Sequence, residues 1–199
     1  RTIEVEGLLP IDERARLRLG WTGAKYSNRN ANVTAAYSNA NLRAKDWFQP
    51  HAGFAVELSP EAEIFGGFTQ VTRAFSSATT TGPFSTNQVG FDAIRDDLKP
   101  EQSDTYELGL RYNTPMFNGV LGAYLVNFRN RLLAVTVGSP IQGLASALQN
   151  VGGVRALGFE AAGDLELGSG FGVYASYSYT DATYRDDVLN SSDGTLVAA

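Results

Sequence analysis

Arginines and carboxylates at alternate positions are the residues of this sequence best suited to chemistry. Arg14, Arg16 and Arg18 alternate with Ala15 and Leu17. Alternate side chains of a strand point to one face, so such runs predict a charged wall that faces water. Guanidinium and carboxylate groups form strong paired hydrogen bonds, which suit charge pairing or guidance of a charged ligand. The simpler alternative is a wall that is only solvated. The candidates are Arg14, Arg16, Arg18, Glu107, Arg111, Arg129, Glu160, Asp164 and Glu166.

Aromatic side chains in polar stretches are a second set of candidates for ligand contact. Trp47, Phe48, Phe84 and Phe91 lie outside the clearest alternating runs. Exposed loop aromatics can stack on an aromatic or sugar ring of a ligand, although loop aromatics alone are weak indicators of a site.

Metal-ligating residues are few. His51 is the only histidine, so a site with several histidines is excluded, and we expect an ordinary polar side chain at the end of a strand. The acidic pairs at residues 96–97 and 186–187 could meet a cation, because hard ions take carboxylate oxygens. Neither pair belongs to a complete binding loop, so we predict no metal site.

Signals of catalysis are lacking. The chain has no cysteine, which excludes disulfides, thiolate metal sites and cysteine nucleophiles. The Gly168-Ser169-Gly170 sequence is too short for a nucleophile elbow and suits a hairpin turn. No glycine-rich phosphate motif precedes a helical pattern. The sequence therefore predicts neither an enzyme nor a bound cofactor.

The charged residues are positioned by strands, most clearly over residues 155–181. Leu157, Phe159 and Leu165 alternate with carboxylates in the first arm, and Val173 and Tyr177 alternate with polar residues in the second. A period of two predicts a hairpin with one apolar and one polar face. Each arm has roughly ten residues, which at about 3.3 Å per residue and a tilt near 45° span about 25 Å, the height of a bilayer's apolar band.

Six further strand-like runs cover residues 2–7, 14–21, 52–58, 63–73, 105–113 and 120–131. Short connections alternate strictly with long polar ones, which cover residues 26–49, 74–102, 132–153 and the stretch from residue 184. Transmembrane β-barrels show this alternation, whereas soluble sandwiches do not require it. Aromatic residues near strand ends would suit the two membrane interfaces: Tyr26, Phe68, Tyr112, Phe128 and Tyr179.

Two local patterns give more specific predictions. In the run over residues 120–131, Val120 and Tyr124 are predicted on the apolar face, opposite Arg129, with Leu121 and Leu125 on the wetter face. Within the connection over residues 132–153, apolar residues recur at helical spacing and predict a short amphipathic helix. These residues are Ile141, Leu144, Ala145 and Leu148.

Composition limits the classes of function. The net charge of -5 and the lack of basic runs argue against nucleic-acid binding. No run of eighteen apolar residues occurs, so no transmembrane helix is expected. The first residue lies in a strand-like run and the last residues carry no terminal feature, so we expect a segment of a longer protein.

Residues 98–112, Leu-Lys-Pro-Glu-Gln-Ser-Asp-Thr-Tyr-Glu-Leu-Gly-Leu-Arg-Tyr, resemble a mid-barrel strand of TonB-dependent outer-membrane receptors. Residues 123–130, 150–160 and 174–182 are similar to the following strands of that family, in the same order. Residues 67–75 are similar to an earlier run, although Phe75 stands where proline is common. The resemblance is strong over residues 98–181 and looser before them.

The resemblance implies an all-β, antiparallel transmembrane barrel in the outer membrane of a Gram-negative bacterium, with about eight of about 22 strands in residues 1–199. Its short turns would be periplasmic and its long loops extracellular. The plug domain, the TonB box and the remaining strands would lie outside the chain. Such receptors import ferric siderophores or similar scarce ligands, with energy supplied through TonB, ExbB and ExbD. The charged wall would then contact the plug or the ligand, and the apolar face would contact outer-membrane lipid.

Two alternatives remain open. A small closed barrel of eight strands, with a structural or adhesive role, would pair residues 2–7 with residues 171–181. A barrel enzyme would need a catalytic cluster at one rim, and His51 has no evident serine partner. The identity of the ligand depends on loops and on a plug, so the sequence does not indicate it.

Overall fold

One large antiparallel sheet dominates the computed structural model, which describes residues 1–30, 40–75, 88–137, 145–150, 152–186, 188–189 and 196–197. Its eight strands follow the order β1-β2-β3-β4-β5-β6-β9-β10. Their bounds are β1 Thr2–Pro10, β2 Ala15–Asn30, β3 Ala40–Glu57, β4 Ala62–Thr72, β5 Gln102–Asn113, β6 Phe117–Arg129, β9 Val154–Gly168 and β10 Phe171–Tyr184. The predicted all-β class is confirmed.

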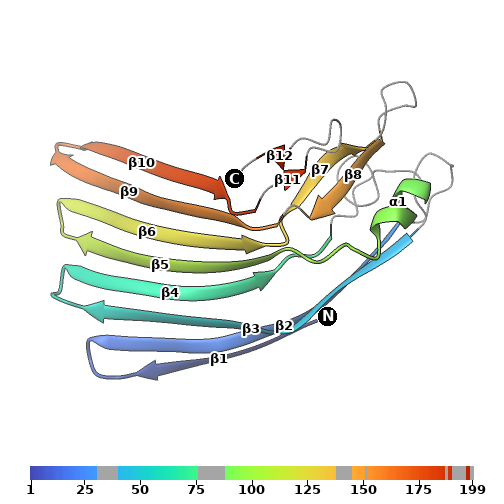
Figure 1. Ribbon diagram of the computed structural model, residues 1–199. Coiled ribbons are helices and arrows are strands. Elements are labelled where there is room, and N and C mark those ends of the chain that lie inside the picture. Colours follow the sequence, from blue (N-terminus) through green and yellow to red (C-terminus); the bar gives the residue numbers. More distant parts are fainter. Residues whose placement is uncertain are drawn as a thin grey trace.

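Two small hairpins and one helix lie outside this sheet. β7 (Leu132–Val137) pairs with β8 (Ala145–Asn150), and β11 (Val188–Leu189) pairs with β12 (Leu196–Val197). Helix α1 spans Gln88–Ile94. Figure 1 shows these elements at one end of the sheet and the four tight turns at the other. The predicted alternation of short and long connections is confirmed.

The strands are longer than predicted at the end where the long connections lie. Residues 26–30 and 40–49, predicted as loop, continue β2 and β3, which have 16 and 18 residues. In the β3 extension Ala40, Leu42 and Ala44 alternate with polar residues, but this apolar set lies on the side of the sheet that is polar elsewhere and packs beneath other residues. Tyr26, Leu42 and Ala44 contact Phe75 and Phe91 there. In this extension the apolar and polar faces of the sheet are therefore exchanged relative to the part predicted at the membrane.

The tight turn between β9 and β10 depends on glycine. Gly168, Ser169 and Gly170 all have positive φ, of 83°, 55° and 83°. Glycine adopts such values without a steric cost, whereas a Cβ atom is disfavoured there. The predicted hairpin at this position is confirmed.

The helix predicted within residues 132–153 is wrong where the structure describes it. Ala145 and Leu148 lie in strand β8, which pairs with β7, and Ile141 and Leu144 lie outside the described residues. The ladder to β7 satisfies the backbone of this segment and overrides its local apolar spacing. The single described helix, α1, comes from a stretch predicted as loop.

The two faces of β6 are the reverse of the prediction. Leu121 pairs with Leu110 and Ala161, whereas Val120 pairs with Arg111 and Ala162. Directly paired residues share a face, so Leu121 lies on the apolar face and Val120 on the polar face. The phase is set by the turn before β6, where the Thr114 backbone donates to the Phe117 carbonyl oxygen at 2.7 Å. Because β6 has apolar residues on both faces, its sequence alone does not show which set of alternate residues lies on the apolar face of the sheet.

Among the residues that the structure describes, none forms a second layer over the apolar face. Leu108 is 58% exposed, Leu121 51% and Tyr177 60%. A soluble sandwich would bury these side chains, so the arrangement fits a sheet whose apolar face meets lipid. Within the described residues, no helix is long and apolar enough to cross a bilayer.

The sheet is open, with β1 and β10 at its two edges. The small closed barrel required residues 2–7 to pair with residues 171–181, and among the described strands β1 pairs with β2 and β10 with β9 instead. That alternative is therefore wrong for this structure. Open edges present unpaired backbone groups that a further strand can join.

Candidate functional site

The candidate site is the polar face of the sheet, because its strands gather there most of the charged side chains predicted from sequence. The register places Arg16, Arg18 and Arg111 on this face of β2 and β5. The same face carries carboxylates on β5 and β9, namely Glu107, Glu160, Asp164 and Glu166. Seven predicted residues therefore share one wall.

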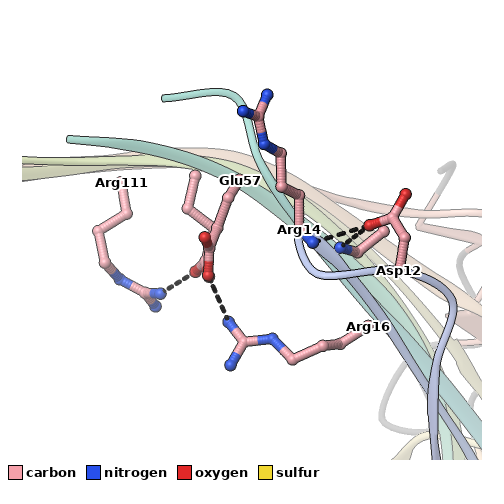
Figure 2. Close-up of polar contacts among 7 residues, drawn as sticks. Asp12, Arg14, Arg16, Glu57 and Arg111 are labelled. Carbon is pink, nitrogen blue, oxygen red and sulfur yellow. Dashed lines mark hydrogen bonds and ion pairs between the residues drawn. The ribbon is translucent and has the colours of Figure 1, made fainter. Parts of the chain in front are cut away.

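Glu63 is the centre of the largest ion-pair group on this wall. It pairs directly with Glu57 of β3 on one side and with Arg111 of β5 on the other. Arg16 Nη2 lies 2.7 Å from Glu63 Oε2 and 3.8 Å from Glu57 Oε1, and Arg111 donates to Glu63 Oε1. Figure 2 shows Arg16 and Arg111 pointing toward the labelled Glu57 from two sides. Two cations thereby offset two glutamates that register brings face to face.

Arg111 also packs on an aromatic ring. Its guanidinium carbon lies 4.8 Å from the centre of the Phe65 ring. The ring in turn lies over Gly109, where a Cβ atom would meet Phe65 and the Leu121 carbonyl oxygen, the latter at 2.9 Å. Because Gly109 has no side chain, the ring can approach its backbone, and the guanidinium of Arg111 packs on the ring.

A second ion-pair group lies on β1, β2 and β3. A carboxylate oxygen of Glu6 lies 3.5 Å from Arg18 Nε, and the other lies 3.5 Å from His51 Nε2. The imidazole crosses β2 above Gly20, where a Cβ atom would overlap both the ring and the Val5 carbonyl oxygen. With Glu4 these groups place three potential ligand atoms within 4.8 Å of one another. Arg18 already supplies positive charge to Glu6, so we assign His51 to this polar cluster and not to a metal site.

A shallow hollow on the polar face holds the side chains of Glu107 and Glu160. It is lined by Phe65, Glu107, Val120, Tyr124, Glu160 and Tyr174, among others. In the part of the chain that the structure describes, neither Glu107 nor Glu160 forms an ion pair or hydrogen bond through its side chain. The neighbouring hydroxyl groups of Tyr124 and Thr180 form a hydrogen bond with each other. The hollow therefore offers negative charge beside aromatic rings.

Two predicted wall residues lie elsewhere. Arg14 belongs to the β1–β2 turn, where its backbone donates to Asp12 Oδ1 at 2.7 Å, and Figure 2 shows its side chain directed away from the Glu57 group. Arg129 lies on the face opposite Arg111 and pairs with Asp104 at 3.0 Å. The prediction that Arg129 shares the polar wall is wrong, because the phase of β6 was inverted.

The aromatic candidates have different environments. Trp47 and Phe48 are exposed, at 43% and 64%, beside an irregularity in the β2–β3 ladder. Phe91 is only 2% exposed and packs with Leu42, so the prediction of an exposed loop aromatic is wrong there. Phe84 lies outside the described residues.

Sequence reasoning missed the partners of the arginines. Glu57 and Glu63 flank the turn at residues 58–61, and that turn sets them opposite each other. The position of these two glutamates on either side of a tight turn is the feature of the sequence from which their pairing could have been predicted. Of the acidic pairs, Asp96 contacts Arg95 at 3.5 Å and Asp186 accepts from the Gly153 backbone at 2.6 Å, whereas residue 187 is not described.

The comparison with protein families identifies the sheet. The profile described as "TonB dependent receptor-like, beta-barrel" matches residues 5–198. The chain belongs to this family. Its open sheet is therefore part of a TonB-dependent receptor barrel, which confirms the resemblance seen over residues 98–181.

Solved structures with the same fold agree with this assignment to the TonB-dependent receptor barrel. The copper transporter OprC is 21% identical, with a TM-score of 0.67 over 98% of this chain and 31% of OprC. The alcaligin outer-membrane receptor FauA from Bordetella pertussis is 18% identical, with a TM-score of 0.62 over 92% of this chain and 30% of FauA. The pyoverdine outer-membrane receptor FpvA from Pseudomonas aeruginosa PAO1 is 19% identical, with a TM-score of 0.63 over 99% of this chain and 26% of FpvA. The chain thus spans less than a third of each.

Proposed function

We propose that the whole protein is a TonB-dependent receptor in the outer membrane of a Gram-negative bacterium and that it imports a ferric siderophore or a similarly scarce ligand. The chain would supply eight strands of a barrel of about 22 strands. The observation that carries the proposal is the two-sided sheet of a TonB-dependent receptor barrel, with exposed Leu, Phe and Tyr on one face and ion pairs on the other.

The apolar face suits contact with lipid. Phe159 packs between Tyr177 and Tyr179, with ring centres 5.7 and 5.8 Å apart, and all three rings stay more than 40% exposed. The polar face would then line the lumen, where a plug domain and the ligand path would lie. No step of covalent chemistry is required for this role, and no cofactor is proposed.

The ion pairs of the wall suggest how it would hold a plug. Arg16, Arg18 and Arg111 already have carboxylate partners within the wall. Glu107 and Glu160 have none in the described part of the chain, so they are the groups free to bind cations of a plug. Carboxylates that pair with arginine form strong bidentate bonds when partly buried. Contact with a plug would thus depend on Glu107 and Glu160, whereas Arg16, Arg18 and Arg111 would hold strands of the wall to one another.

Uptake by cells tests the proposed function. A strain that lacks the chromosomal gene is complemented with the full-length gene and supplied with radioactive iron bound to a panel of siderophores, and with copper in a separate arm. We expect uptake of at least one ligand that disappears when TonB is deleted. TonB would act with ExbB and ExbD. Uptake that continues without TonB, or no difference between the complemented and deleted strains for any ligand, would contradict the proposal.

A further inference from the structure

An apolar groove crosses the apolar face of β5, β6, β9 and β10, at the end of these strands where their tight turns lie. Figure 1 shows the four strands side by side, with both turns at the same end. The groove has a volume of about 580 Å³. We call it the β9 groove, because β9 lies between the other strands that form its floor. Its sides are formed by large apolar and aromatic residues, among them Tyr112, Phe117, Leu121, Leu165 and Tyr177.

The floor of the β9 groove consists of residues with little or no side chain. Gly119 of β6 pairs directly with Gly163 of β9, which pairs in turn with Ala175 of β10. In the next row of the ladder, Ala161 lies between two large residues of β6 and β10. Directly paired residues share a face, so three neighbouring strands present almost bare backbone at this level.

Aromatic rings close two sides of the β9 groove. The Phe117 ring leans over Gly119, where a Cβ atom would lie 2.7 Å from Cζ of the ring. The Tyr112 ring lies beside it, with ring centres 6.4 Å apart. Farther from the turns, Tyr177 packs with Phe159 at 5.7 Å between ring centres. The groove is therefore bounded by rings and keeps a bare floor between them.

The β9 groove is continuous with the face that the proposed receptor turns toward lipid. Leu121, which forms one of its sides, is 51% exposed, and Leu108 of the same face is 58% exposed. None of the described residues that line the groove is charged. Water would find few partners on such a surface, and an empty groove would lose dispersion contacts along its floor. Hydrocarbon from the surrounding lipid is therefore the occupant that this interface supplies.

The position of the groove along the strands indicates which lipid leaflet fills it. From Ala161 to Leu165 the strand advances by about 13 Å, which a tilt near 45° reduces to about 9 Å of height. The hydrocarbon of one leaflet is about 15 Å thick, so the groove fits within a single leaflet, on the side of the tight turns. Tyr112 lies at that end, next to the turn between β5 and β6, where a tyrosine hydroxyl can reach the headgroup layer.

We propose that the β9 groove retains one acyl chain of a phospholipid in the leaflet on the side of the tight turns, with the lipid headgroup near Tyr112. The proposal rests on the outer-membrane location proposed above, in which these turns are periplasmic. A chain in the groove contacts the floor and the rings beside it, whereas a chain on a flat surface is contacted from one side only. Each added atom contact is weak, but several of them act together. The retained lipid therefore exchanges more slowly than its neighbours.

Native mass spectrometry of the purified full-length receptor with added phosphatidylethanolamine tests the site. Ala175→Phe places a ring on the floor of the β9 groove, whereas Ala175→Gly leaves the floor open. Gly7→Phe is the matched control, because Gly7 pairs with Leu19 on the same face of β1 and a Cβ atom there would meet only the Leu19 carbonyl oxygen, at 3.9 Å. Loss of about ten atom contacts corresponds to about tenfold weaker binding of one lipid by Ala175→Phe. The other two variants should bind as the wild type does.

Further arms identify the occupant. A lysophospholipid should compete, because a single chain fills the groove, and glycerophosphoethanolamine, the same headgroup without chains, should not. Equal lipid binding by the wild type and Ala175→Phe, or an equal loss in Gly7→Phe, would overturn the proposal. So would competition by the headgroup alone. A dimer that Ala175→Phe abolishes would also overturn it, since a second copy would then cover the groove.

Parallel assays separate this proposal from the proposed function. Migration on an unheated gel shows whether each variant is folded, and Ala161→Leu is a second way to fill the groove if Ala175→Phe does not fold. Import of a ligand by cells, together with equal lipid binding by all variants, would overturn the lipid site alone. Groove-dependent lipid binding without import of any ligand would support the lipid site and contradict the transport function alone.

Discussion

Glu63 shows how one residue can organise part of the polar wall. Its side chain is 17% exposed, whereas those of Arg16 and Arg111 remain about half exposed, at 52% and 48%. The carboxylate therefore lies deeper than the two guanidinium groups that bind it. Such a shared carboxylate holds two strands to β4 through side chains as well as through the backbone ladder.

Substitution of Glu63 by Gln should weaken the barrel measurably. Two arginines would lose their charged acceptor, but both are half exposed and water can replace the partner, so we expect a loss of about 1 kcal/mol in unfolding free energy. Guanidinium chloride unfolding of the full-length receptor in lipid measures this. Glu57→Gln is the matched control, because Glu57 lies 3.8 Å from Arg16, and it should change stability by less than half as much. Equal effects would contradict the central role of Glu63.

Gly20 provides a second test of single-residue packing. In Gly20→Ala, the added methyl would overlap the His51 ring and the Val5 carbonyl oxygen, so β1 or the ring must shift, at a cost of about 1–3 kcal/mol. Gly122→Ala on the same face is the control, since its nearest atom would be the Leu108 carbonyl oxygen at 4.0 Å. In thermal unfolding, Gly20→Ala should have a lower melting temperature than Gly122→Ala. Similar melting temperatures would show that His51 does not lie over Gly20.

The sequence predicts where the strands occur. It does not predict which alternate residues of a strand share a face, or how long each strand is. The hairpin of β9 and β10 is predicted because Leu157 and Phe159 alternate with carboxylates and because Gly168 and Gly170 mark the turn. In β6, apolar residues occur on both faces, so alternation alone gives the wrong phase. Cross-strand partners depend on register, which a turn such as that before Phe117 fixes.

The β9–β10 turn gives a prediction at this scale. Ser169 has φ of 55°, a conformation that costs a residue with a Cβ atom about 1–2 kcal/mol. A β-branched valine is worse suited, so Ser169→Val should destabilise the barrel and slow its refolding. Ser169→Gly should leave stability unchanged or raise it by up to about 1 kcal/mol. Refolding into lipid vesicles, followed by gel migration, measures both, and a valine variant as stable as the glycine variant would contradict the assigned turn.

For the whole molecule, the sequence indicated the two-sided sheet because lipid and water each select one set of alternate residues. It did not indicate the small core around Phe75 and Phe91, where the loop-side segments fold onto β2 and β3. Nor did it indicate that Glu57 and Glu63 would meet. Both depend on contacts between segments far apart in the chain, which local periodicity does not encode. The family resemblance supplied what periodicity lacked, namely the larger barrel of which this sheet is part.

Lipid exposure of neighbouring residues in β6 shows whether the sheet has one side toward lipid and one toward the lumen. The chain contains no cysteine, so Leu121→Cys and Val120→Cys introduce single labels within it, on neighbouring residues that face opposite sides of the sheet. Each full-length variant carries a fluorophore and is placed in vesicles with nitroxide-labelled lipid. We predict strong quenching at residue 121 and little at residue 120. Equal quenching, or stronger quenching at residue 120, would contradict a sheet with one lipid-facing and one lumen-facing side.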